Sequence, residues 1–135
     1  MIKINNSLIS NLLTQAAANP RLRQNFDLRS SEADASQRML NALQPGTVVP
    51  IHRHPNSNES IVLLSGKAEE IFYDVEGRET ERLLMDPEAG SYGCVVPAGC
   101  WHTIVALEPT VIMEAKDGRY GEDGSESFPA KNQGL

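Results

Sequence analysis

The sequence predicts an all-β fold, closed into a barrel or sandwich and preceded by one short helix. About eight short segments with strand character follow one another at intervals of about 8–12 residues, with turn residues between them. No helical segments alternate with these strands, which excludes a parallel α/β sheet. A chain of 135 residues is long enough to build one hydrophobic core, so we expect a single domain over residues 1–135.

The composition excludes several classes of function. The formal net charge is −6, and no cluster of lysine and arginine offsets it, so a nucleic-acid partner is not expected. No apolar run approaches the roughly 20 residues of a membrane helix, and the N-terminus lacks the pattern of a signal peptide. We therefore expect a cytoplasmic protein without a membrane partner. Cys94 and Cys100 fit reduced packing residues better than a disulfide, with Cys100 a further candidate for the edge of the site discussed below.

The first third of the chain predicts a helix followed by an irregular segment. An apolar stripe at helical spacing marks a helix over about 7–18, formed by Leu8, Ile9, Leu12, Leu13, Ala16 and Ala17. Pro20 ends this helix, which we expect to pack on the outside of the barrel or against a partner subunit. Residues 21–36 are polar and carry Arg21, Arg23 and Arg29. These arginines are either solvated or include one that reaches an anionic ligand.

The barrel is predicted over about 37–117. Its strands are expected at 37–43, 48–54, 60–65, 68–74, 79–85, 92–96, 101–107 and 111–116. Residues 55–58 read PNSN and form a turn by composition. The segment at about 118–135 is rich in glycine, serine and acidic residues, so it is expected to be loosely ordered or to fold over the barrel or a partner.

The chain has three histidines, and all of them fall in one pattern. His52 and His54 lie two residues apart on a predicted strand, so both side chains project from the same face. Glu59 follows the turn and opens the neighbouring strand, where its carboxylate can return to the same point. His102 opens another strand after the turn at 97–99. We therefore predict a metal site formed by His52, His54, Glu59 and His102.

Three imidazoles and one carboxylate suit one divalent transition metal per chain, namely Fe, Mn, Ni, Co or Zn, rather than Ca or Mg. With a divalent ion the site carries net charge +1, which attracts a carboxylate, enolate or diolate oxygen. A six-coordinate metal would keep two positions open for a bidentate small-molecule ligand or O₂.

Three further polar residues are candidates for a catalytic role. Arg38 either holds a substrate anion or is a solvated edge arginine. Tyr73 points into the barrel or out of it. Glu114 shares its face with Lys116, and the two are expected to form an ordinary ion pair. Because every histidine is assigned to the metal, acid–base chemistry would fall to a carboxylate, Tyr, Lys or metal-bound water.

These residues resemble the cupin signature. The first motif of that superfamily is matched by Gly46, His52, His54, Glu59 and Gly66. The second is similar to the stretch from Gly90 through Pro97 and Gly99 to His102, with one extra residue after Gly90 and with Ala106 in place of the usual asparagine. The resemblance implies a cupin jelly-roll β-barrel that holds a metal and is commonly a homodimer.

A narrower resemblance covers most of the chain. The segments QRMLNALQPGTVVPIHRHP, IFYDVEGR, VPAGCWHTIVALEP and EAKDGRY are similar to WbuC-type cupin-fold metalloproteins, often found among genes for cell-surface polysaccharides. Arg119 replaces a proline that is usual in that family's tail. This resemblance implies a fold and a metal, and it leaves the reaction open.

Two main functions are compatible with this pattern. The first is a metal-dependent enzyme, either a dioxygenase or a sugar isomerase or epimerase, acting on a small oxygenated metabolite such as a sugar or keto acid derivative. The alternative is a non-catalytic cupin that binds a metal and ligand as a sensor or accessory protein. A purely structural metal is a third, less favoured alternative, because it would need a closed tetrahedral site.

Overall fold

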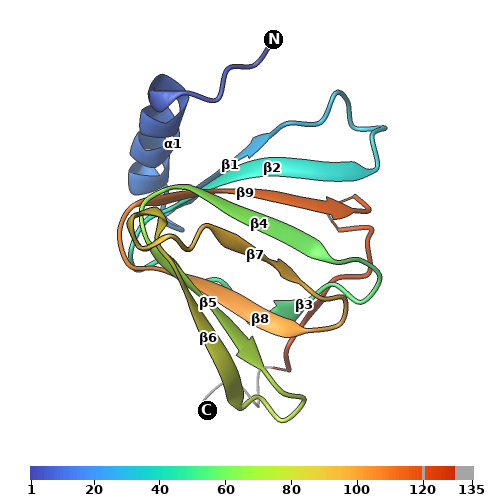
Figure 1. Ribbon diagram of the computed structural model, residues 1–135. Helices are drawn as coiled ribbons and strands as arrows, with labels where there is room; N and C mark the ends of the chain where they lie inside the picture. The colour runs from blue at the N-terminus through green and yellow to red at the C-terminus, as the bar shows by residue number, and fades with distance from the viewer. Residues whose placement is uncertain (120, 130–135) are drawn as a thin grey trace.

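The computed structural model describes residues 1–119 and 121–129, which form two antiparallel sheets and one α-helix that packs on the first of them (Figure 1). The helix α1 spans Asn6–Ala18, and a 3₁₀ helix spans Pro87–Ala89. Within the described residues the strands are β1 Arg23–Asp27, β2 Ser36–Leu43, β3 His52–Arg53, β4 Glu59–Ser65, β5 Ala68–Tyr73, β6 Glu79–Met85, β7 Gly93–Val96, β8 Trp101–Ala106, β9 Thr110–Asp117 and β10 Glu126–Ser127. The prediction of a mostly β fold with one short N-terminal helix is confirmed.

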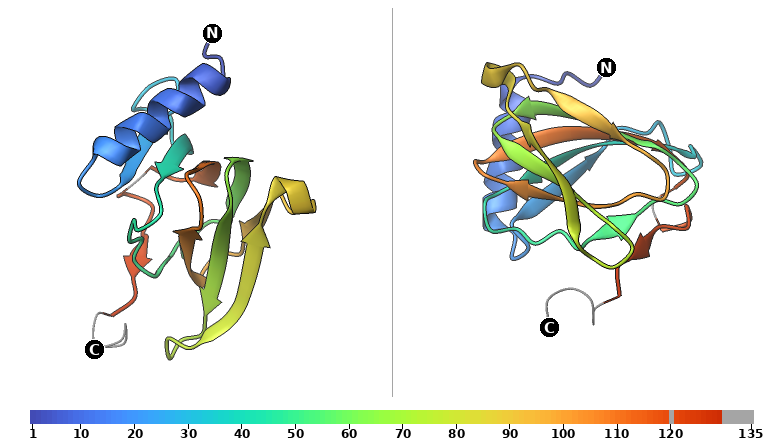
Figure 2. Two further views of the ribbon diagram at one scale, coloured as in Figure 1. Left: turned by 90° about the vertical axis from the view of Figure 1, so that its left-hand side faces the viewer. Right: turned by 60° about the horizontal axis from the view of Figure 1, so that its bottom comes forward.

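The two sheets face each other and enclose the core (Figures 1 and 2). The strand orders are β1-β2-β9-β4-β7 and β10-β3-β8-β5-β6. Inward residues of both sheets meet in one apolar cluster, which includes Leu43, Ile61, Met85, Ile104 and Ile112. Because side chains alternate along each strand, the same strands can present apolar residues to this core and polar residues elsewhere.

Helix α1 covers the outer face of the first sheet. Leu12 and Ala16 of the helix pack against Leu40 and Ala42 of β2 and against Val111 of β9 in a second apolar cluster. This is one of the two packing arrangements that the apolar stripe of the helix predicted. No helix among the described residues is long and apolar enough to span a membrane.

The structure differs from the sequence prediction at two strands. The stretch that we expected to be irregular contains β1, which pairs antiparallel with β2 over five residues. Phe26 is the only apolar residue of β1, so the strand carries no readable alternation. The predicted strand at 48–54 is reduced to His52–Arg53. Pro50 has no N–H for a sheet ladder, which explains the late start.

The described part of the C-terminal segment folds over the barrel. Its strand β10 pairs with β3, and Arg53 forms an ion pair of 3.1 Å with Glu126. Phe128 is 3 % exposed and packs edge-on against Trp101, with ring centroids 4.9 Å apart. The sequence left open whether this segment is loosely ordered or folds over the barrel or a partner. Its described part folds over the barrel. Tyr120 and residues 130–135 lie outside the described residues.

The final glycine of the first cupin motif is required by its surroundings. Gly66 has φ +93°, in the left-handed region that favours glycine. A Cβ atom at this position would lie 2.2 Å from the backbone oxygen of Pro109, so the β4–β5 turn packs directly on the chain that enters β9.

We expect Gly66→Ala to lower the free energy of unfolding by about 3 kcal/mol or more, because backbone strain adds to an overlap with a backbone atom. Gly90→Ala is the matched control, since Gly90 has φ +77° but no atom within 4 Å of the added Cβ. It should cost only about 1 kcal/mol. Urea denaturation of both variants measures the difference, and equal losses would contradict this explanation of Gly66.

Candidate metal centre

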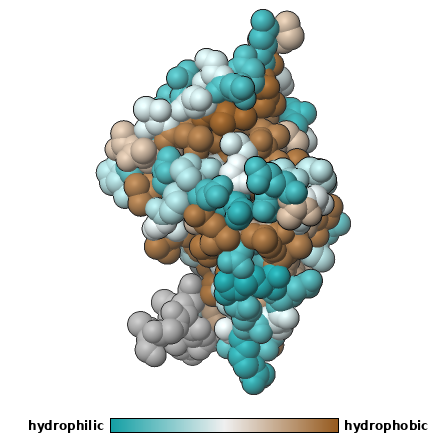
Figure 3. Space-filling model, turned by 60° about the vertical axis from the view of Figure 1, so that its left-hand side comes forward, coloured by the Kyte–Doolittle hydropathy of each residue, from teal (hydrophilic) through white to brown (hydrophobic). Residues whose placement is uncertain are grey.

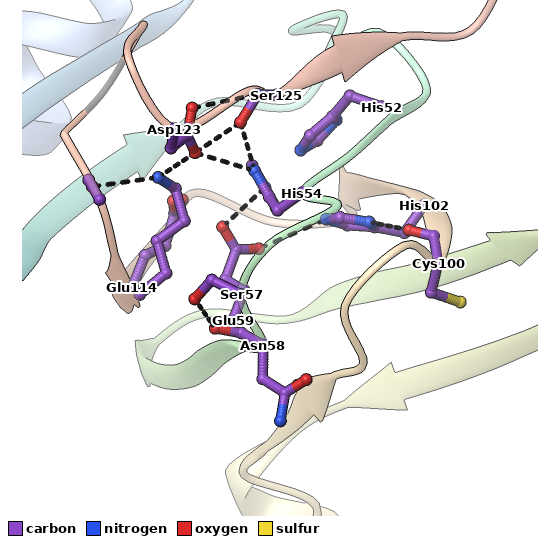
Figure 4. Close-up of polar contacts among 12 residues, drawn as sticks. His52, His54, Ser57, Asn58, Glu59, Cys100, His102, Glu114, Asp123 and Ser125 are labelled. Carbon is purple, nitrogen blue, oxygen red and sulfur yellow. Dashed lines mark hydrogen bonds and ion pairs between the residues drawn. The ribbon is translucent and has the colours of Figure 1, made fainter.

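Three histidines from one sheet and its adjoining loop converge on one point (Figure 4). His52 of β3 and His102 of β8 are cross-strand partners, and His54 follows β3 directly. The ring centroids of His52 and His102 are 4.3 Å apart, and that of His54 lies 5.0 and 5.5 Å from them. One ligand nitrogen from each ring lies within 4.8 Å of the other two.

Glu59 reaches these histidines from the opposite sheet. We expected it on the strand next to them, but β4 belongs to the sheet that faces β3 and β8. Its carboxylate oxygens lie 3.1 Å from Nε2 of His54 and 3.3 Å from Nε2 of His102. The four residues named by the sequence are thus brought together across both sheets.

The protein fixes the tautomer of each ring. Nδ1 of His52 lies 2.7 Å from the carbonyl oxygen of Pro50, and Nδ1 of His102 lies 2.9 Å from that of Cys100. A carbonyl oxygen only accepts hydrogen bonds, so Nδ1 must carry the proton in both rings. Nε2 then keeps its lone pair, as a metal ligand requires.

His54 is held in the same tautomer, with its proton on Nδ1, by the C-terminal segment. Its Nδ1 lies 2.6 Å from Oγ of Ser125, whose hydroxyl donates to Asp123 over 2.6 Å. Ser125 therefore accepts the Nδ1 proton of His54 (Figure 4). Asp123 in turn forms a buried ion pair with Lys116, and hydrogen bonds from Lys116 and Ser125 overcome the effect of burial and lower its pKa.

The free nitrogens of these rings fit a metal. Nε2 of His54 and Nε2 of His102 are buried without a hydrogen-bond partner among the described residues, and a carboxylate oxygen of Glu59 lies 3.1 and 3.3 Å from them. Burial, followed by the charge of His102, lowers the pKa of His52 to about 4, so this ring is neutral near pH 7. Buried lone pairs without a partner are costly, and a divalent metal would satisfy them.

The histidines open onto a cavity of about 730 Å³ between the two sheets. This volume is in the range of pockets that bind small molecules. Ile61, Ile104 and Ile112 form its apolar part. The rest of its wall is polar and includes Gln37, Asn41, Glu70, Glu114 and Lys116.

Two buried carboxyl groups line this cavity beside Glu59. Oε1 of Glu70 lies 3.9 Å from Nε2 of His102, and burial followed by the charges of Glu59 and Glu114 raises the pKa of Glu70 well above its usual range. Burial and the charge of Glu59 likewise raise the pKa of Glu114 to about 7. Glu114 accepts a hydrogen bond of 3.2 Å from Asn41.

The other predicted candidates are distributed as follows. Glu114 faces the cavity, but Lys116 pairs with Asp123, so the expected ion pair between Glu114 and Lys116 is wrong. Arg38 lies on the opposite face of β2, is 45 % exposed in its side chain and pairs with Asp34. Tyr73 has the opposite parity to Glu70 on β5 and does not line the cavity.

Glu70, Asp123 and Ser125 were not among the site residues predicted from the sequence. Glu70 could have been found, because it has the same strand parity as Ala68 and Phe72, which are inward apolar residues. Asp123 and Ser125 carry no periodic signal, because they lie in a loop and reach His54 through a contact between residues 71 positions apart. Cys94 and Cys100 are free thiols, and burial raises the pKa of Cys94 to about 12, so Cys94 is no thiolate ligand near pH 7.

Several solved structures share this fold. The chain is similar to the capsular polysaccharide assembling protein CapF from Staphylococcus aureus, with 19 % identity, TM-score 0.67 and 83 % of this chain covered. It is also similar to a cupin 2 domain-containing protein from Halorhodospira halophila, with 20 % identity, TM-score 0.61, and 82 % of this chain and 71 % of that chain covered. Oxalate decarboxylase from Bacillus subtilis, whose structure is described with Mn(II) centres, shares 23 % identity at TM-score 0.59 over 78 % of this chain.

This chain spans only 33 % of the CapF chain and 27 % of the oxalate decarboxylase chain. No curated protein matches the sequence at a significant level. The structural neighbours establish the cupin jelly-roll fold. Among the described residues, His52, His54 and His102 lie close enough together to hold a metal ion. The family described as "Domain of unknown function (DUF6016)" matches residues 4–85, more than half of the chain, so this cupin-fold chain belongs to that family.

Proposed function

We propose that this chain is a metal-dependent cupin that binds and transforms a small oxygenated metabolite at His52, His54, Glu59 and His102. One observation carries the proposal. Three imidazoles have their Nδ1 atoms held by hydrogen bonds and direct their free Nε2 atoms, beside a carboxylate, into a cavity of about 730 Å³. A closed structural site would leave no room for a ligand beside the metal.

When bound, Fe, Mn, Ni, Co or Zn at this centre would supply a Lewis acid for an oxygen ligand. The residues of the chain have separate tasks. Pro50, Cys100 and Ser125 hold the rings in place through Nδ1. Glu70 and Glu114 supply buried carboxyl groups beside the substrate space, where either can hold or deliver a proton. These two groups favour an enzyme over a non-catalytic sensor.

We further propose that the chain is a WbuC-type cupin connected with surface polysaccharides. The sequence segments that resemble that family support the assignment. A second support is the similarity in fold to a protein described as assembling capsular polysaccharide. A screen of sugars and sugar derivatives against the metal-loaded protein tests the connection, and binding of keto acids alone would contradict it. The expected cytoplasmic location stays a prediction.

We also propose a homodimer formed through the outer face of β4 and β7. Val62 and Val95 are 41 % and 59 % exposed on that face, and β7 is an edge strand. Apolar side chains also reach the surface between hydrophilic ones on the face drawn in Figure 3. An exposed edge strand with apolar neighbours fits pairing with a second copy.

We expect the purified protein, made without a histidine tag, to hold about one transition-metal ion per chain. His52→Ala should lose that metal, and added metal should then no longer raise the melting temperature as it does for the original chain. Elemental analysis and thermal unfolding measure both effects. Arg38→Ala is the control that keeps the metal, because its side chain lies outside the cavity. Full metal content in His52→Ala would refute the assignment.

Ser125→Ala should weaken metal affinity by about 10–100-fold, because His54 loses the acceptor that fixes its Nδ1 proton. Competition with a chelator measures the affinity. Ser127→Ala is the matched control, since Ser127 lies two residues away and, unlike Ser125, is not the partner of any histidine Nδ1 atom among the described residues. Equal affinities for the two variants would show that Ser125 does not orient His54.

Sedimentation velocity should give a species of twice the 14.8 kDa chain mass. Val95→Asp should shift it to the monomer, because a charge would be buried in the proposed interface. Val75→Asp should leave the dimer intact, since Val75 is 78 % exposed on a separate hairpin. A monomeric original chain, or two variants with the same mass, would contradict this interface.

A further inference from the structure

Unpaired hydrogen-bond acceptors line the cavity beside the histidines. Gln37 is 4 % exposed and Glu70 is 0 % exposed, and both line the cavity together with Asn41. Oε1 of Gln37, Oδ1 of Asn41 and both carboxylate oxygens of Glu70 are buried without a hydrogen-bond partner among the described residues. Burying such an atom without a donor costs about 1–3 kcal/mol.

These acceptors come from both walls of the cavity. Gln37 and Asn41 lie on β2, whereas Glu70 lies on β5 of the opposite sheet. The amide of Asn41 has a fixed orientation, because its Nδ2 donates to Glu114 and its Oδ1 is therefore the free atom. Glu70 is close to the metal centre, 3.9 Å from Nε2 of His102. A ligand at the centre would thus meet acceptors on two sides.

This wall discriminates between classes of ligand. A dicarboxylate brings no donors for the free oxygens of Gln37 and Asn41. Glu59, Glu70 and Glu114 would repel its charges beside the histidines, whereas Arg21, Arg23 and Lys116 also line the cavity and would attract them. An apolar ligand would leave the acceptors without partners. Hydroxyl groups donate and accept, so they satisfy amide oxygens and carboxyl groups in either protonation state.

We propose that the cavity selects a polyhydroxylated ligand, a sugar or cyclic polyol. Its hydroxyls would donate to Gln37 and Asn41 and would donate to or accept from the carboxyl group of Glu70, while one edge of the molecule faces the histidines. This inference rests on the proposed metal-dependent function and deepens it, because it favours a sugar over a keto acid. It also separates this cavity from that of a protein acting on oxalate, although the fold is shared.

The test is calorimetric titration of the full, metal-loaded chain with single probes. The hydroxylated probes are glucose, galactose, xylose and myo-inositol, and the contrasting probes are oxalate, malonate and cyclohexanol. At least one hydroxylated probe should bind, at least tenfold more tightly than any contrasting probe. Metal content is measured on the same samples.

Variants of Gln37 test whether the unpaired oxygens of the cavity contribute to binding. Gln37→Leu should weaken binding of the best hydroxylated probe about tenfold, because one acceptor is lost at similar volume. Gln37→Glu keeps an acceptor and should restore most of the affinity. Arg38→Ala changes a residue on the opposite face of the same strand, so the affinity for this probe should stay unchanged.

The outcomes distinguish a wrong metal site from a wrong ligand class. A protein without bound metal would refute the proposed function, and this inference with it. A protein that holds its metal but prefers oxalate or malonate, or binds none of the hydroxylated probes, would overturn the ligand class alone. Equal affinity in Gln37→Leu and the original chain would also overturn it.

Discussion

The candidate site depends on the hydrogen bonds at Nδ1 of the three histidines. Each ring gives its Nδ1 proton to an acceptor held by the chain, so each Nε2 keeps its lone pair and a fixed direction. Without these acceptors an imidazole could take the other tautomer and turn its N–H toward the centre. The ligand set is thus preorganised by backbone carbonyls and one hydroxyl, not by the histidines alone.

This preorganisation joins parts of the chain that are far apart in sequence. β3 and β8 present His52 and His102 from one sheet, and β4 presents Glu59 from the other. The segment after β9 closes the arrangement, because the Lys116–Asp123 ion pair holds Ser125 against His54. The fold and the site are therefore coupled. Separation of the sheets or release of this segment would disturb the centre directly.

Strand alternation and turn residues made part of this site predictable from the sequence. Strand alternation placed His52 and His54 on one face, and the turn at 97–99 placed His102 beside them. The pattern could not show that Glu59 crosses to the facing sheet, because parity specifies a face and not a neighbour. It also missed β1, in which Phe26 is the only apolar residue. The role of Ser125 could not be predicted from the sequence, since it depends on a long-range contact with His54.

The central claim is that all three rings use Nε2. Two-bond ¹H–¹⁵N correlation spectra of the histidine rings test it most directly, recorded before and after zinc is added. The account predicts three rings protonated at Nδ1 without metal, and zinc-dependent shifts at all three Nε2 atoms. Protonation at Nε2 in any ring, or a zinc-dependent shift that is larger at Nδ1 than at Nε2, would contradict it.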